Sequence, residues 1–473
     1  DLLDGAEQTL FCRLAVFTGG CTLQAAEAVC NGERDLAIDF LDGLTSLVDK
    51  SLMRQEEAPG PGGNLEPRFT MLETIREFAL ERLEERGESG ILRRRHAEYF
   101  RELANQSFWI MMSAARDPIL EMVSYERDNI RATLQWSLDN RVPGLALPIV
   151  GHLWIWYLHM APAEGLRWMQ DLLALPEAQG RTLERAFGLV GADACAWGVG
   201  LVHRAQQYAA EAVAIARELD DDLTLAAALI GYAGATPDYS SVEAAREARE
   251  ILRPMHQDMA FAFASWVPAF TLPYHGDVAT VSLWLEEALA IGRRTEDDWV
   301  QAVVLMLQGF IAIAGRNLEV AHSLLTESAR RYRLSPDKLN LAGVLLALGG
   351  IARLGGDSAI ATEHFHEALR LSLQLNDQGN IAACLEGLAG VHLVENDPER
   401  SARLLGAAKT LRDTTGAVAL PTSDALNSGI SESVRAAIDS DMFARAFDEG
   451  SRMAEVEAVR YALDVLPVHV IAS

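Results

Sequence analysis

The 473-residue sequence is short of positive charge. It has 41 Lys and Arg against 67 Asp and Glu, a formal net charge of −26, and its only lysines are Lys50, Lys338 and Lys409. Contacts to phosphates need a basic surface, so this balance argues against direct nucleic acid binding. None of the three lysines follows a glycine, which excludes a P-loop of the form GxxxxGK[ST] within this chain. Any nucleotide hydrolysis is therefore expected elsewhere.

Long hydrophobic runs and a secretory signal are also missing. No apolar stretch reaches the length of a membrane span, and Gly151–Met160 is too short for one. The chain begins at Asp1 rather than Met, so we expect it to be part of a larger protein with no membrane contact. The cysteines lie in apolar helical contexts without metal-ligand spacing, which predicts reduced, buried thiols in a cytoplasmic protein. These cysteines are Cys12, Cys21, Cys30, Cys195 and Cys384.

Catalytic and metal-binding patterns are absent as well. The sequence has no Gly-x-Ser-x-Gly, no His-Glu-x-x-His, and no Cys with a plausible His partner motif. His152 and His159 lack Cys, Asp or Glu at a metal-binding spacing. An aromatic cluster around them is interpreted as core. We therefore expect no enzyme activity, no metal and no cofactor in this chain. The cluster consists of Trp154, Trp156, Tyr157, His159 and Trp168.

A pattern that recurs every 40 residues fills residues 261–417. Each unit has a turn at a small polar residue, with a small residue eight positions before it. Two small positions and one large apolar position follow the turn. Small residues let two helices approach closely and the large one fills the space between them, which predicts an α-solenoid of helix pairs. The small residues before the turn are Ala269, Gly309, Gly349 and Ala389, and the turn residues are Asp277, Asn317, Asp357 and Asp397. After the turn, the first small position holds Val281, Ala321, Ala361 and Ser401, and the large position holds Leu285, Leu325, Phe365 and Leu405. The second small position holds Ala288, Ser328, Ala368 and Ala408.

This spacing resembles the tetratricopeptide repeat. That family has Gly or Ala in its first helix, then Ala, a large apolar residue and Ala, as at Gly349, Ala361, Phe365 and Ala368. The family's unit is about 34 residues long, so we expect longer, tetratricopeptide-like units here. Residues 184–219 and 223–252 are interpreted as two degenerate units.

The first 90 residues predict a winged-helix domain, three helices and a β-hairpin. The expected helices are 7–17, 23–30 and 36–47, the strands 51–57 and 68–72, with a loop at 58–67 and a further helix at 73–85. Such a domain either reads DNA through its third helix or packs on a neighbour. Residues 1–100 hold 11 Lys and Arg against 19 Asp and Glu, and phosphates would repel this surface, so packing on a neighbour is favoured.

Several motifs carry a resemblance over nearly the whole chain. They are Phe11–Gly20, Leu44–Leu52, Arg68–Ala79, Arg94–Phe100, Glu126–Ala132, Glu164–Trp168, Ala444–Gly450 and Glu457–Leu463. They look like bacterial ATP-dependent transcriptional regulators of the signal-transduction ATPase (STAND) class, related to the NB-ARC ATPases and LuxR/AfsR-like. The resemblance implies a winged helix that packs against an upstream ATPase module, followed by a helical-repeat sensor. Many members end in a LuxR-type DNA-binding domain.

One triplet departs from the NB-ARC pattern. In that class a Met-His-Asp triplet follows the hairpin and its His contacts the ADP phosphate. The matching residues here are Met71-Leu72-Glu73, and Leu has no donor, so direct nucleotide contact is not expected. The ATPase and DNA-reading domains are expected outside this chain, with ATP or ADP only in a missing upstream module.

A ligand or partner groove is predicted on the first helices of the repeats. Trp266, Phe270 and Tyr274 are four residues apart, so they should share one helical face. Aromatic and Met side chains with one Arg suit an apolar peptide, a protein partner or a small effector. The alternative is that these residues pack against adjacent repeats. The candidate residues are Phe263, Trp266, Phe270, Tyr274, Met306, Phe310 and Arg353.

The predicted domains are a winged helix (1–90), connecting helices (91–182), the solenoid (183–420) and a C-terminal helical cap (421–473). Two functions compete. The first is the sensor portion of an ATP-dependent transcriptional regulator, relaying effector or partner binding to an ATPase and output domain. The second is a stand-alone protein–protein scaffold. A GxxxxGK[ST] motif upstream of Asp1 in the parent chain would separate them.

Overall fold

The structure, a computed structural model, describes residues 2–32, 35–60, 64–415 and 421–464, without the side chains of Tyr274 and Pro421. It has two compact units, one of residues 1–196 and 203–231, the other of residues 197–202 and 232–473. The finer division into four domains stays a prediction. No helix in the described ranges is long and apolar enough to cross a membrane.

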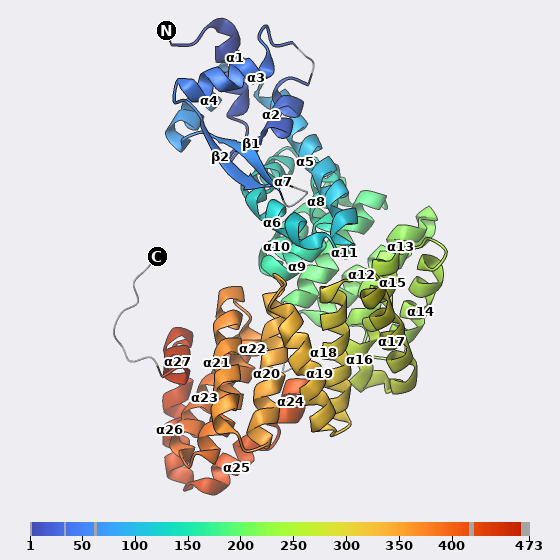
Figure 1. Ribbon diagram of the computed structural model, residues 1–473, viewed down its shortest axis with the longest axis vertical. Coiled ribbons are helices and arrows are strands. Elements are labelled where there is room, and N and C mark those ends of the chain that lie inside the picture. The colour runs from blue at the N-terminus through green and yellow to red at the C-terminus, as the bar shows by residue number, and fades with distance from the viewer. Residues whose placement is uncertain (1, 33–34, 61–63, 416–420, 465–473) are drawn as a thin grey trace. The chain divides into compact units, whose positions relative to one another are not determined.

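The first unit begins with the predicted winged helix (Figure 1). Its elements are α1 (Gly5–Leu14), β1 (Cys21–Thr22), α2 (Leu23–Cys30), α3 (Phe40–Asp49), β2 (Arg54–Pro59), β3 (Leu65–Thr70) and α4 (Glu73–Glu85). The three helices and the hairpin are confirmed. The sheet has a third strand that the sequence reading missed, because β1 pairs antiparallel with β3 and gives the order β1-β3-β2. Residues 61–63 of the predicted hairpin loop lie outside the described residues.

Side-chain caps set where the first three of these helices begin. Thr22 caps α2 through a hydrogen bond from the Ala25 amide. The predicted start of the third helix at residue 36 is wrong, because the Asp39 side chain accepts from the Leu41 and Asp42 amides and starts α3 at Phe40. The acidic group at this helix start is therefore part of the fold.

Connecting helices follow the winged helix. They are α5 (Ser89–Met111), α6 (Arg116–Tyr125), α7 (Arg127–Asp139), α8 (Pro143–His152), α9 (Trp154–Met160), α10 (Pro162–Leu173) and the short η1 (Pro176–Ala178). Next come α11 (Leu183–Gly198), α12 (Val202–Leu219) and α13 (Asp222–Ala235), in the range predicted as degenerate repeat units. The interpretation of the aromatic cluster as core is confirmed at Trp156, Tyr157 and Trp168, which are buried. All five cysteines are buried free thiols, also as predicted.

The second unit contains the helix pairs. Its helices are α14 (Ser240–Leu252), α15 (Asp258–Trp266), α16 (Pro268–His275), α17 (Val278–Arg294), α18 (Asp298–Ala314), α19 (Leu318–Tyr332), α20 (Lys338–Leu354), α21 (Ser358–Leu375), α22 (Gln378–Val394), α23 (Pro398–Thr415), α24 (Pro421–Asn427), α25 (Ile430–Ala437), α26 (Ser440–Ser451) and α27 (Glu455–Ala462). Figure 1 shows α18 to α23 packed side by side, which confirms the α-solenoid.

The 40-residue columns do what their sizes predict. A methyl group added at Gly309 would lie 2.7 Å from the Leu325 side chain, and one at Gly349 would lie 2.9 Å from the Phe365 ring. Leu325 and Phe365 are fully buried. The turn residues are helix caps: Asp357, for example, accepts a hydrogen bond from the Ile360 amide, which starts α21. Close helix contact therefore depends on the small residue facing the large one.

The first repeat departs from the pattern. Its first helix is divided, because α15 ends at Trp266 and α16 begins at Pro268. Proline has no amide hydrogen and its ring disfavours a continuous helix. The Phe270 amide bonds to the Val267 carbonyl, three residues back. The stretch through Trp266, Phe270 and Tyr274 is therefore two helices, and a shared face for the three residues stays a prediction.

Candidate functional site

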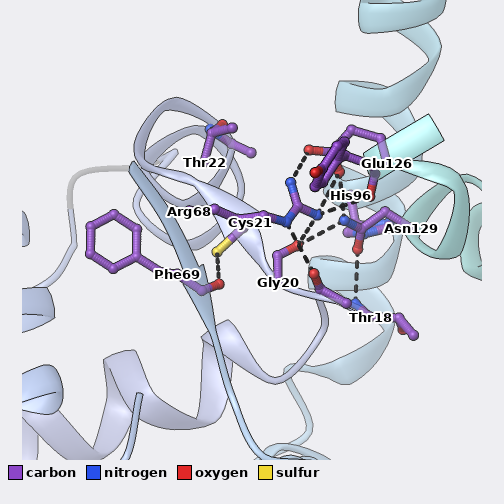
Figure 2. A network of polar contacts seen from close by, with 12 residues as sticks. Thr18, Gly20, Cys21, Thr22, Arg68, Phe69, His96, Glu126 and Asn129 are labelled. Atoms are coloured by element: carbon purple, nitrogen blue, oxygen red, sulfur yellow. Dashed lines mark hydrogen bonds and ion pairs between the residues drawn. The ribbon is translucent and has the colours of Figure 1, made fainter. Parts of the chain in front are cut away.

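A buried arginine joins the winged helix to the connecting helices. Arg68, on β3, is only 4% exposed. Its Nη1 donates to Glu126 Oε1 at 2.5 Å, its Nε to the Gly19 carbonyl at 3.1 Å, and its Nη2 to the Gly20 carbonyl at 3.1 Å. Figure 2 shows this guanidinium between the Gly20 turn and Glu126. A buried charge needs such partners, so the position of Arg68 is strongly specified.

The turn at Gly19-Gly20 makes this arrangement possible. Both glycines have positive φ, 78° and 89°, where other residues are strained. A methyl group on Gly20 would lie 2.6 Å from the Phe69 carbonyl oxygen. Only glycine lets the turn approach β3 this closely and present its carbonyls to Arg68.

Asn129, on α7, completes the network. Its Nδ2 donates to the Gly20 carbonyl at 2.8 Å and to Glu126 Oε2 at 2.7 Å, and its Oδ1 accepts from the Thr18 amide at 2.8 Å. The side chain is fully buried. One amide therefore holds both ends of the turn after α1 against α7.

His96, on α5, is the last member. Its Nε2 lies 3.3 Å from Asn129 Oδ1, and its Nδ1 lies 3.0 Å from Thr133 Oγ1. Burial lowers the pKa of His96 to about 4, so the ring is neutral at pH 7. Because Asn129 Oδ1 is an acceptor, the ring proton is assigned to Nε2, and Nδ1 accepts from Thr133.

The same α7 motif also grips α10. Arg127 donates to Glu164 Oε2 at 2.5 Å, and Arg131 donates to both Glu164 oxygens at 2.7 and 2.8 Å. Burial alone would raise the pKa of Glu164, but the bonds from Arg131 and Arg127 outweigh it and lower the pKa to about 2. Residues 126–132 thus bind the winged helix with two side chains and α10 with two others. We use the name wing junction for Arg68, His96, Glu126 and Asn129 together with the Gly19-Gly20 turn, without the contacts to α10.

The wing junction was missed in the sequence analysis. Arg68, Glu126 and Asn129 lie inside the motifs Arg68–Ala79 and Glu126–Ala132, but nothing in the sequence pairs them. Within the described residues no group of three His, Cys, Asp or Glu side chains could hold a metal. The wing junction can fix the winged helix to the helices that follow it.

Lys50, which directly follows the third helix of the winged helix, is held in an ion pair. Lys50 Nζ bonds to Glu7 Oε1 at 2.5 Å, and Ser46 donates to the same oxygen at 2.6 Å. At the matching nucleotide-contact triplet, Leu72 precedes α4 and is 46% exposed, while Glu73 pairs with Arg76.

The predicted groove residues fall into two groups. Phe263, Trp266 and Met306 are buried, at 8%, 2% and 2% exposure. The Trp266 ring lies 4.6 Å from Phe263 and 5.7 Å from Trp299 between ring centres. These three rings form one packed cluster on α15 and α18. This packing is what the alternative reading expects of them.

The remaining groove residues are less buried. Phe270 and Phe310 are half-buried, and Phe270 lies 5.1 Å from Trp197 between ring centres. Half-buried Arg353 donates to the Leu426 carbonyl at 2.6 Å. The Tyr274 side chain lies outside the described residues. A ligand-binding role for the set stays a prediction.

These features define a winged helix followed by an α-solenoid, and comparisons agree with the first part. The winged helix-turn-helix domain family matches residues 3–84. Proteins of Mycobacterium bovis and Mycobacterium tuberculosis that carry the provisional name HTH-type transcriptional regulator are 26% identical over 98% of this chain. The chain spans 65% of the length of these relatives.

Two solved structures are remotely similar. A Rap protein complexed with competence and sporulation factor gives a TM-score of 0.46 at 13% identity, covering 71% of this chain and 99% of that one. A STAND protein with a tetratricopeptide repeat sensor from Pyrococcus horikoshii gives 0.42 at 13% identity, covering 86% and 63%. Both TM-scores lie below 0.5, so neither likeness bears on what this chain binds.

Proposed function

We propose that this chain is the sensing and relay part of an ATP-dependent transcriptional regulator of the STAND class. The solenoid takes up a peptide, protein or small effector, and the winged helix passes the change to an ATPase module elsewhere in a longer protein. The similarity to mycobacterial proteins named as transcriptional regulators, of which this chain spans 65%, supports this. In this proposal the chain itself is not an enzyme, needs no cofactor, and works in the cytoplasm.

The observation that carries the proposal is the wing junction. A domain that only linked two partners would not need a buried Arg68–Glu126 pair, whose two side chains are each 5% exposed. Separating the two side chains would leave each charge buried without its partner, so the pair favours one geometry. A movement of α5 to α7 would therefore carry the winged helix with it.

DNA reading by the winged helix itself is not part of the proposal. The chain's net charge of −26 opposes phosphate contact, and Lys50 is held by Glu7. A gel shift at two salt concentrations should show no salt-dependent retardation of duplex DNA by this chain.

The test uses the longer protein that includes the sequence upstream of Asp1. We expect ATP hydrolysis by that protein, and a changed basal rate in Arg68→Met, because the winged helix would no longer follow α5 to α7. Arg82→Met is the matched control, since Arg82 forms an exposed pair with Glu85 in α4. An unchanged rate in a folded Arg68→Met protein would contradict the relay. A longer protein without ATPase activity would leave the scaffold function instead.

A further inference from the structure

A segment of the chain itself packs on the first helices of three repeats. Helix α24 lies against α18, α20 and α22 (Figure 1). Helices α24 and α21 pack on different faces of α20, because Gly349 faces Phe365 whereas the next residue, Gly350, faces Leu426. We call the face of α18, α20 and α22 under α24 the inner surface.

Two glycines seat this segment. A methyl group at Gly350 would lie 2.9 Å from Leu426 Cδ1, and one at Gly390 would lie 2.8 Å from Arg353 Cδ and 2.9 Å from Ile430 Cδ1. Leu426 and Ile430 are 4% and 5% exposed. The two glycines are one repeat apart, and the same column holds Phe270 and Phe310 in the earlier repeats. The column thus changes from Phe in α16 and α18 to Gly in α20 and α22, where the two glycines face Leu426 and Ile430.

Polar contacts of the segment are few. Arg353 Nη2 donates to the Leu426 carbonyl at 2.6 Å, and Asn427 Nδ2 donates to the Ala383 carbonyl at 3.3 Å. Arg353 Nε has no hydrogen-bond partner among the described residues. Burial lowers the pKa of Arg353. Among the described residues, no carboxylate forms an ion pair with its guanidinium. A half-buried guanidinium is thus satisfied only in part.

We propose that residues 422–430 are an internal ligand of the inner surface, and that the effector is a peptide that takes their place with an aliphatic side chain on Gly350 and its C-terminal carboxylate on Arg353. This deepens the proposed function and rests on it for the meaning of the exchange. A carboxylate presents two oxygens and a negative charge to one guanidinium, whereas a main-chain carbonyl presents one neutral oxygen. The effector therefore gains a contact that the internal segment lacks.

The segment itself supplies the probe. A fluorescent peptide of residues 422–426 ends at Leu426, so its free carboxylate falls where Arg353 now holds a carbonyl. The variant Leu426→Ser/Ile430→Ser should vacate the inner surface. We expect this variant to bind the peptide at least roughly tenfold more tightly than the wild-type chain, and the acid roughly tenfold more tightly than the same peptide with a C-terminal amide.

Matched glycine variants locate the binding. Adding Gly350→Leu to the double variant should abolish peptide binding, because it fills the seat of the leucine. Adding Gly343→Ala should leave binding unchanged. Gly343 lies on the same helix as Gly350, and a methyl group there would meet nothing within 4 Å. Arg353→Gln should remove the preference for the acid over the amide. Binding that ignores Gly350→Leu, or a folded double variant that does not bind, would overturn the proposal.

If the double variant does not fold, hydrogen exchange of the wild-type chain decides. Saturating peptide should speed amide exchange in residues 422–437, and unchanged exchange there would overturn the proposal. Failure of the two ideas is distinguishable. Peptide binding without any effect on ATP hydrolysis in the longer protein would defeat the proposed function and leave the inner surface as a peptide site.

Discussion

The wing junction and the repeats hold helices together by opposite means. At the junction, a few buried polar groups each have one set of partners, as Arg68 does with Glu126 and the Gly19-Gly20 carbonyls. In the repeats, a small residue faces a large one, as Gly349 faces Phe365, and the arrangement recurs every 40 residues. Polar partners specify one geometry, whereas size columns tolerate exchange of residues of similar volume. A relay suits the first and an adaptable sensor suits the second.

Breaking the junction should have the largest effect. Arg68→Met leaves Glu126 buried without its cation and should cost about 3–5 kcal/mol of local stability. Hydrogen exchange of the β3 amides measures this. Arg82→Met, at an exposed pair, should cost about 1 kcal/mol or less. Arg68→Met/Glu126→Leu should recover most of the loss, and a double variant no better than the single one would show that the pair is not what matters.

A large-to-small change in the repeats should cost a similar amount, for a different reason. Phe365 is fully buried between Gly349 and Gly387, so Phe365→Ala should cost about 3–5 kcal/mol through the cavity it leaves. Gly349→Ala should cost less, about 1–3 kcal/mol, by overpacking. Gly349→Ala/Phe365→Leu should regain part of that loss, because the smaller leucine makes room for the added methyl group. At the junction, by contrast, the double variant recovers stability because both charges are removed. Exchange in α20 to α22 is the readout, and additive losses in the double variant would contradict size matching.

Acid should weaken the wing junction through its buried histidine. The pKa of His96 falls from 6.5 to about 4 in the fold because of burial. The unfolded chain therefore binds the proton more readily, so stability is lost as pH falls from about 6.5 to 4, by up to about 3 kcal/mol. His96→Gln should flatten this slope in the first unit. His152, whose pKa is lowered in the same way, would leave a residual slope. A wild-type chain with equal β3 exchange at pH 7 and pH 5 would contradict the neutral His96.

The smallest effect is expected at the helix caps. Asp357→Ala removes the side-chain acceptor for the Ile360 amide and should cost about 1 kcal/mol, while Asp357→Asn should be nearly neutral. Lys409→Ala, at an exposed pair with Asp413, should change little. Thermal unfolding of the three variants, measured side by side, checks this order, and an equal loss for Asp357→Asn would show that charge rather than the cap matters.

The sequence predicted the features that depend on spacing. The 40-residue columns, the turns at Asp277 and Asp357, and the winged helix are all present. Each depends on residues near one another in the chain or at a fixed period. The start of α3 was misplaced because the stronger cap, Asp39, lies three residues beyond the predicted start.

Contacts between distant segments could not be predicted in this way. Arg68 and Glu126 are 58 residues apart, and Arg353 and Leu426 are 73 apart. Nothing in a single sequence says which of many charged residues will meet. Strand β1 was missed because two residues carry no periodicity. Among the candidate groove residues, only the burial of the ring cluster at Phe263 and Trp266 could have been guessed from their size.

The fixed period also sets how this protein can change in length. Asn317 and Asp357 are equivalent turn residues, so removing residues 318–357 would join a turn to the helix start it already resembles and keep every small residue opposite a large one. Removing a few residues more or fewer would turn the remaining helices about their axes and expose the columns. Natural variants of this array should therefore differ by whole units of 40 residues, and a variant that lacks residues 318–357 would also lose Gly350 and Arg353 of the inner surface.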